Sequence, residues 1–224
     1  MNKKIYYYMG LGLVILIFGI FALTEISRRV ENKEVTDVDR HQVGKKKAEM
    51  MTIGKAPKFS FTDQHGNIIS NATFKDKVYV LDFIFTTCPS ICPIMTKNMV
   101  TVQNAFNNKP IGIVSITINP ENDTPEVLKA YAEEYGVTNP DWHFLTGDKE
   151  TIYKLANEGF NLYAGQGDQF EGGFEHSGMF ALIDKDGNIV CRKDNFGNPI
   201  VYYDGIEPEG IEMLISDIQQ LLKN

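Results

Sequence analysis

Two nearly continuous runs of β-branched and aromatic residues limit what this chain can fold into more than any other feature. They are Val78–Phe85 and Ile111–Ile118, and each has the length of one strand. Runs without a polar face are typical of strands that are buried on both faces of a sheet. A helical pattern from Cys92 to Phe106 lies between them. The sequence therefore predicts a β–α–β unit at the centre of the fold.

Further elements surround this unit. They are a hairpin over Phe59–Ile69, a helix from Thr124 to Tyr135, a short strand Trp142–Leu145, a helix from Asp148 to Glu158, a hairpin of Met179–Ile183 with Ile189–Arg192, and an amphipathic closing helix from Gly210 to Leu222. This order predicts an α/β fold, a mixed sheet with helices on both faces. Six glycines in Gly159–Gly178 indicate a long functional loop rather than a regular element.

The first residues predict a membrane anchor. Ile5–Leu23 is a run of 19 residues without a charge, and about 20 apolar residues span a bilayer. Lys3 and Lys4 precede it, which favours an inside N-terminus. A cleaved signal peptide is the alternative, but no small-x-small site lies near Phe21–Thr24. We expect a cytoplasmic tip (1–4), a transmembrane anchor (5–23), a linker (24–53) and a domain (54–224) on the outer side of a bacterial inner membrane.

Charge excludes one class of partner. Residues 1–50 carry a net charge of +3, and the remainder carries −10. Binding to nucleic acid needs clustered lysines and arginines, so we expect no nucleic-acid partner. Three cysteines are too few for a disulfide scaffold, but they suffice for one reactive pair.

Cys88 and Cys92 follow the first buried strand, in the loop and at the start of the next helix. Unpaired backbone N–H groups at a helix start favour negative charge and lower a cysteine pKa. Because the thiolate is both a nucleophile and a metal ligand, the pair suits redox chemistry or a soft metal. The alternative is two buried small hydrophobes, which the adjacent prolines disfavour. Cys191 lies in an apolar strand and indicates a structural role.

Among the four histidines, His176 has the best context for a ligand. His41 lies in the linker, His65 in a turn and His143 in a short strand, where packing is expected. His176 ends the glycine-rich loop, which can fold over the cysteines. Two thiolates and one imidazole form a three-coordinate soft site that suits Cu(I), whereas zinc usually takes a fourth ligand. The residues thus favour copper over zinc.

Three segments resemble the Sco/SenC family of membrane-anchored, thioredoxin-like copper proteins. They are Phe85–Pro93 with its CPxxCP element, Ser115–Pro125, and His176-Ser177 followed by Phe180–Asp184 and Asp186-Gly187. The resemblance covers roughly Gly54 to the C-terminus and the single anchor. It implies a thioredoxin-like sheet, a redox pair of Cys88 and Cys92, and copper, as Cu(I) or Cu(II), held by Cys88, Cys92 and His176.

The resemblance also implies a role. A metallochaperone of this family helps to assemble the dinuclear copper centre of cytochrome c oxidase subunit II, or reduces that subunit's cysteines. The implied partners are subunit II or another copper or thiol protein, and the membrane through the N-terminal helix. The chain departs from the family pattern in two places. Asn119 stands where the family usually has Asp, and no Gly precedes Phe85-Thr86. Neither departure changes the three ligands. A metal-free thiol–disulfide oxidoreductase and a thiol peroxidase remain as alternatives.

Overall fold

The computed structural model describes residues 12–13, 16–24, 27, 48–107, 109–167, 169–194 and 196–223. The chain divides into two units, Met1–Val43 and Gly44–Asn224. Described residues of the first unit are helical, and their large apolar side chains are exposed. The expected anchor (5–23) and linker (24–53) lie partly outside the described residues, and the tip (1–4) and His41 lie wholly outside. Within the described part, no helix has both the length and the apolar character that crossing a membrane requires.

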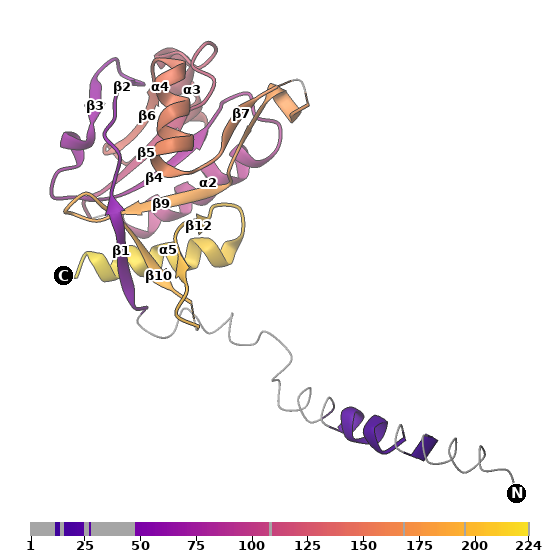
Figure 1. The fold of residues 1–224 in the computed structure, drawn as a ribbon. Coiled ribbons are helices and arrows are strands. Elements are labelled where there is room, and N and C mark those ends of the chain that lie inside the picture. The colour runs from indigo at the N-terminus through magenta and orange to yellow at the C-terminus, as the bar shows by residue number, and fades with distance from the viewer. Residues whose placement is uncertain are drawn as a thin grey trace, which may run out of the picture. The chain divides into compact units, whose positions relative to one another are not determined.

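A mixed β-sheet forms the centre of the second unit (Figure 1). Among the described residues its order is β1-β10-β9-β4-β5-β6-β2-β3, with β11 paired to β10 and β12 to β9. These strands are β1 (Met50–Lys55), β2 (Ser60–Asp63), β3 (Ile68–Ser70), β4 (Val78–Ile84), β5 (Ile111–Thr117), β6 (Trp142–Thr146), β9 (Met179–Ile183), β10 (Asn188–Lys193), β11 (Pro199–Ile200) and β12 (Tyr203–Asp204). A separate hairpin consists of β7 (Ala164–Gln166) and β8 (Phe174–His176).

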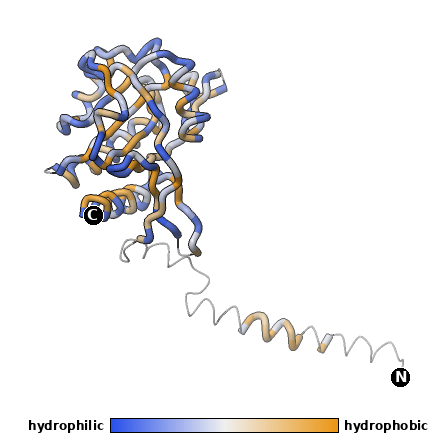
Figure 2. The backbone as a smooth tube through the Cα atoms, turned by 60° about the vertical axis from the view of Figure 1, so that its left-hand side comes forward, coloured by the Kyte–Doolittle hydropathy of each residue, from blue (hydrophilic) through white to orange (hydrophobic). Residues whose placement is uncertain are grey.

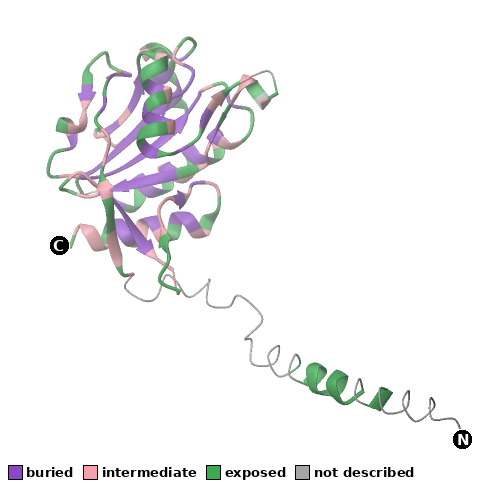
Figure 3. Cartoon of the chain, viewed as in Figure 1, coloured by how far each residue is buried: buried purple, intermediate pink, exposed green. Residues whose placement is uncertain are grey.

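The two sequence runs that predicted buried strands form β4 and β5. All seven residues of each strand are buried, and the two strands pair in parallel from Val78↔Ile111 to Ile84↔Thr117. Strand β6 continues this parallel group beside β5. Figures 2 and 3 show the hydrophobic strands as the buried centre of the unit. Because β4 and β5 are parallel neighbours, the loops that follow them emerge at the same edge of the sheet.

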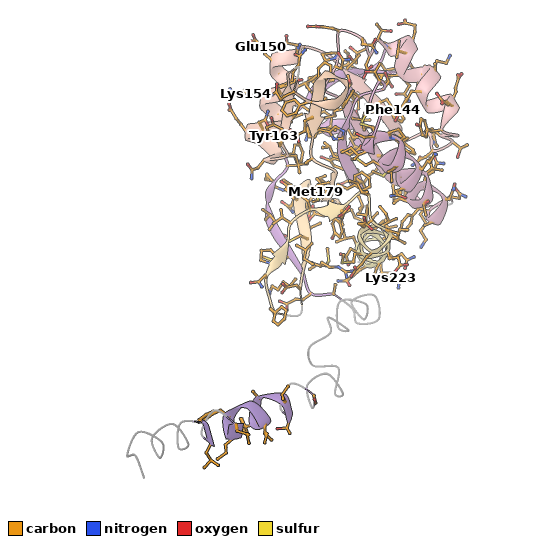
Figure 4. All side chains as sticks on the ribbon, turned by 90° about the vertical axis from the view of Figure 1, so that its right-hand side faces the viewer. Phe144, Glu150, Lys154, Tyr163, Met179 and Lys223 are labelled. Atoms are coloured by element: carbon orange, nitrogen blue, oxygen red, sulfur yellow. The ribbon has the colours of Figure 1, made fainter. Side chains whose placement is uncertain are left out.

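The helices flank this sheet, as the sequence pattern predicts. They are α2 (Ile91–Ala105), α3 (Pro125–Glu134), α4 (Lys149–Lys154) and α5 (Pro208–Leu221). Figure 1 shows α4 on one side of the sheet and α2 on the other. The side chain of Thr124 caps α3 and that of Asp148 caps α4, each by accepting a backbone N–H of the first turn. Glu150 and Lys154 of α4 are exposed (Figure 4).

Three segments differ from the sequence prediction. Strand β1 begins at Met50, inside the range expected to be linker, because it is an edge strand held by backbone pairing with β10. The helix expected to reach Glu158 leaves α-helical geometry after Lys154 and continues as a π-helical turn, η3 (Leu155–Phe160), which Asn161 ends with φ 53°. The glycine-rich segment contains the β7–β8 hairpin, which its low apolar content concealed.

A buried ion pair attaches α5 to the sheet. Arg192 of β10 donates to both carboxylate oxygens of Asp217, at 2.8 and 2.7 Å, and Tyr203 donates to the same carboxylate at 2.7 Å. Arg192 and Asp217 are each 0% exposed. Buried charges persist where they are paired and hydrogen-bonded in this way. The closing helix and strand β10 are thus joined at a point remote in sequence from Cys88 and Cys92.

Candidate metal centre

The loop between β4 and α2 positions the two cysteines. Strand β4 ends at Ile84, Cys88 lies in the loop and is 7% exposed, and Cys92 is the second residue of α2 and 0% exposed. Pro93 fits the first helical turn, where no intrahelical partner exists for an N–H. The Cys92 N–H donates to Cys88 Sγ at 3.4 Å. The sequence prediction for both cysteines, one in the loop and one at the helix start, is therefore confirmed.

His176 reaches the cysteines from the β7–β8 hairpin. It is the last residue of β8, pairs with Ala164 of β7, and is 5% exposed. The ring meets Phe85 edge-on, with centroids 5.8 Å apart. The side-chain amide of Asn157 holds Ala164 at both backbone groups, donating to its carbonyl at 2.9 Å and accepting its N–H at 3.0 Å. The glycine-rich segment thus folds over the cysteines, as the sequence analysis expected.

Cys88, Cys92 and His176 form one group. Their ligand atoms all lie within 4.8 Å of one another, and all three residues are buried. His176 Nε2 lies 2.8 Å from Cys92 Sγ, and Nδ1 lies 3.0 Å from the carbonyl of Ser177. A carbonyl only accepts, so Nδ1 carries the proton in the neutral ring and Nε2 presents a lone pair to the sulfur. Fixing the ring through its other nitrogen is typical of histidines that bind metal.

The two cysteines are electrostatically different. The hydrogen bond from Cys92, with smaller contributions from His176 and the backbone, lowers the pKa of Cys88 to about 3, against the burial that raises it. Burial, followed by the interaction with Cys88, raises the pKa of Cys92. The more accessible sulfur is therefore a thiolate and the inner sulfur a thiol. The pair has one nucleophile and one proton-bearing partner.

A buried carboxyl inside β4 lies within electrostatic reach of the site. Burial raises the pKa of Asp82 to about 7, while Ser115 and, more weakly, His176 lower it. The Ser115 hydroxyl donates to Asp82 Oδ1 at 2.7 Å, and the Trp142 indole N–H donates to that hydroxyl at 3.1 Å. The sequence analysis gave Asp82 no role. An ionisable residue within an otherwise apolar run was the available signal.

The other histidines and the third cysteine of the described residues are not part of the sulfur–imidazole group. His143 packs against Phe74 and contacts Asp63, with Nδ1 3.1 Å from the carboxylate, so the predicted packing role is confirmed. His65 is exposed and Cys191 is 0% exposed, as expected. Asn119 is buried, and its hydrogen bonds within the described residues are made by its backbone.

The donor set fits a soft metal ion. Ligands at about 2.0–2.3 Å from one ion lie within roughly 4.6 Å of each other, close to the observed spread. Thiolate sulfur and imidazole nitrogen are donors that Cu(I) accepts well. Without metal, two cysteine sulfurs within 4.8 Å of each other can also form a disulfide. The same three residues therefore allow metal binding in the reduced state and redox chemistry between states.

Comparisons with known proteins agree with this geometry. The profile of a family described as SCO1/SenC matches residues 47–208. A protein named SCO1 protein homolog, from Bacillus subtilis strain 168, is 33% identical over 164 residues, which cover 72% of this chain and 79% of that protein.

Two solved structures extend the likeness. BsSco, described as a member of the Sco family of cytochrome c oxidase assembly proteins with a disulfide switch, is 30% identical with a TM-score of 0.65, covering 77% of this chain and 96% of that one. Bradyrhizobium japonicum ScoI with copper bound is 23% identical with a TM-score of 0.58, covering 75% and 99%. At that identity the second structure supports the thioredoxin-like fold alone.

Proposed function

The chain belongs to the SCO1/SenC family, and from this premise we propose that it is a copper metallochaperone for cytochrome c oxidase assembly. Cys88, Cys92 and His176 bind the copper ion, which is cargo rather than a permanent cofactor. The recipient in this proposal is the dinuclear copper centre of oxidase subunit II. Membership of a family whose relative BsSco is described as an oxidase assembly protein supports the role.

The observation that carries the proposal is the convergence of two sulfurs and one imidazole in a buried group. The His176 ring is held through Nδ1 by the Ser177 carbonyl, so Nε2 is available as a ligand. Cys88 is already a thiolate, whereas Cys92 must lose a proton when it binds metal. Binding is therefore expected to release about one proton from Cys92 at neutral pH.

Redox state gates the site. Oxidation of the Cys88 thiolate and the Cys92 thiol forms one S–S bond and passes two electrons and one proton to an external disulfide, whose S–S bond breaks to give one thiol and one thiolate. A disulfide offers no thiolate ligand, so only the dithiol binds copper in this proposal. The low pKa of Cys88 stabilises the reduced pair. The protein is thus poised toward the form that holds the metal.

The location belongs to the same proposal. Residues 5–23 form a single-pass anchor, residues 24–53 a linker, and the folded domain stands on the extracytoplasmic side of a bacterial inner membrane. Support comes from the charge-free run and from the exposure of its described apolar side chains, such as Phe18 and Phe21. An anchor of this kind keeps the domain near a membrane-bound oxidase.

Anaerobic Cu(I) titration of the reduced full-length chain in detergent tests the proposal. We expect one tightly bound ion, loss of tight binding in Cys88→Ala and Cys92→Ala, and weaker binding in His176→Ala. His143→Ala is the matched control, because that histidine contacts Asp63 instead. Weak binding that does not respond to His176→Ala contradicts the proposal.

The unequal thiols favour a second candidate function, thiol–disulfide exchange without metal. Cys88 thiolate attacks a partner disulfide and forms a mixed disulfide, and the released partner thiolate takes up a proton. Cys92 then loses its proton, attacks Cys88 Sγ and releases the second partner thiolate. This activity on a protein disulfide survives His176→Ala but not Cys88→Ala, which distinguishes it from copper binding.

A further inference from the structure

Asp123 is a buried carboxylate in the loop between β5 and α3, and it is 0% exposed. It accepts four hydrogen bonds. The donors are the Thr86 N–H at 3.0 Å, the Thr86 hydroxyl at 2.5 Å, the Thr117 hydroxyl at 2.5 Å and the Asn122 side-chain amide at 2.9 Å. Every partner is a donor, so both carboxylate oxygens act as acceptors.

These bonds join the ends of two parallel strands. Thr86 follows β4 and precedes Cys88 by two residues, whereas Thr117 is the last residue of β5. The Cys88 N–H closes a tight turn by donating to the Phe85 carbonyl at 3.2 Å. The stretch that carries Cys88 is therefore fixed to β5 at its start and runs into α2 at its end.

A helix cap does not account for Asp123. The N-cap of α3 is Thr124, whose side chain accepts the Val127 N–H at 3.4 Å. The side-chain hydrogen bonds of Asp123 within the described residues go to Thr86, Thr117 and Asn122, and none goes to α3. Its carboxylate is directed toward the cysteine loop, although a turn residue that precedes a helix ordinarily bonds the helix start.

We propose that Asp123 is a positioning residue that holds the Thr86–Cys88 stretch where Cys88 Sγ meets Cys92 and His176. The inference rests on the proposed copper binding for its functional readout. Metal sites lose affinity when the groups that orient their ligands are removed. A loop that samples other positions must be ordered again when the ion binds, and this ordering weakens binding.

Asp123→Asn tests the inference, with Asp63→Asn as the matched control. Asp63 is also 0% exposed and accepts backbone N–H groups, those of His65 and Asn67, and it contacts His143 rather than the cysteine loop. We expect Asp123→Asn to weaken Cu(I) binding about tenfold and to speed amide hydrogen exchange across Thr86–Cys92. Asp63→Asn should leave both unchanged.

Thr86 supplies a second pair of variants if Asp123→Asn fails to fold. Thr86→Val removes the hydroxyl donor at nearly constant shape and should weaken Cu(I) binding. Thr86→Ser keeps the donor and should bind Cu(I) as wild type does. The inference is overturned if Asp123→Asn binds Cu(I) within twofold of wild type and its Thr86 amide hydrogen exchanges at an unchanged rate. It is also overturned if Asp63→Asn weakens Cu(I) binding equally. If wild type binds no Cu(I), the proposed function fails, and the exchange comparison alone still decides the role of Asp123.

Discussion

Cys92 Sγ lies 2.8 Å from His176 Nε2, although 84 residues separate the two in the chain. The Ser177 carbonyl requires the imidazole proton to be on Nδ1, so in the neutral ring Nε2 presents its lone pair toward the Cys92 sulfur. The imidazole is therefore oriented as a ligand before any metal is present. This arrangement saves the cost of selecting a ring orientation and a tautomer when an ion binds.

The first prediction concerns this tautomer. In the reduced, metal-free protein at mildly alkaline pH, His176 should be protonated at Nδ1 and unprotonated at Nε2. Nitrogen-15 chemical shifts of the imidazole measure this directly. Exposed His65 is the control, because it should show the mixture of tautomers typical of a solvated ring. Protonation of the neutral His176 ring mainly at Nε2 would contradict the orientation described above.

The second prediction concerns the reactivity of Cys88. Its pKa is lowered to about 3, mainly by the hydrogen bond from Cys92, so alkylation by iodoacetamide should stay nearly constant from about pH 5 to pH 9. The alkylation of an ordinary thiol, whose pKa is about 8.5, slows about tenfold for each unit by which the pH falls below that value. Peptide mapping by mass spectrometry gives the rate at each cysteine. Cys191 is buried with a raised pKa and should remain unlabelled in the folded protein.

The same shift of Cys88 has a consequence for stability. A lowered folded-state pKa stabilises the reduced fold at high pH, and this stabilisation is lost as the pH falls toward about 3. Cys88→Ser should remove this dependence. Retention of the full pH dependence in Cys88→Ser would mean that another group is responsible.

The third prediction concerns Asp82, whose shift has the opposite sign. Burial raises its pKa from 3.8 to about 7, so the folded protein binds this proton more tightly than the unfolded chain does. The stabilisation is present below about pH 4 and is lost as the pH rises through 7, a total of about 4 kcal/mol at most. Denaturant unfolding at several pH values, compared between wild type and Asp82→Asn, measures it.

Two comparisons make the Asp82 prediction specific. The isosteric Asp82→Asn change removes the titration, so its stability relative to wild type should improve steadily from pH 4 to pH 8. Burial raises the pKa of Asp63, but hydrogen bonds from Asn67, His65 and His143 outweigh it and lower that pKa below 3.8. The stabilisation by Asp63 is therefore lost only as the pH falls below about 4, and Asp63→Asn should show no trend from pH 4 to pH 8. A difference between wild type and Asp82→Asn that is independent of pH would show that the pKa of Asp82 is not raised by folding.

Local signals in the sequence were enough to predict the central strands and the cysteine positions. Val78–Phe85 has no polar face, and the two cysteines follow it closely, so both predictions needed only neighbouring residues. The role of His176 also depended on a long-range contact, and the family resemblance supplied what spacing alone could not. The structure places His176 beside the cysteines, as predicted, because it ends strand β8 of the β7–β8 hairpin.

Other features depend on partners distant in the chain, which no local pattern reveals. Strand β1 is defined by its pairing with β10, and its residues show little alternation of their own. The environment of Asp82 comes from Ser115 and Trp142, which lie on two other strands. The β7–β8 hairpin is held by the side chain of Asn157 at Ala164 and by the packing of Phe174 against Phe85.

The fourth prediction uses Asn157 to test how the hairpin positions His176. Asn157 holds both backbone groups of Ala164, and Ala164 is the strand partner of His176. Asn157→Ala should cost about 1–2 kcal/mol of unfolding free energy and should weaken Cu(I) binding about tenfold. The imidazole nitrogen-15 signals of His176 should also broaden in the metal-free protein, because the ring loses its fixed orientation.

Asn71 provides a control with the same bonding pattern at another place in the fold. Its side-chain amide donates to the Pro57 carbonyl at 3.0 Å and accepts the Phe59 N–H at 2.8 Å, and neither partner belongs to the β7–β8 hairpin. Asn71→Ala should therefore lower stability by a similar amount while Cu(I) binding and the His176 signals stay as in wild type. If both variants weaken Cu(I) binding equally, general destabilisation is the cause and the hairpin has no particular role. If only Asn157→Ala does so, the strand pairing of Ala164 with His176 sets the position of the imidazole.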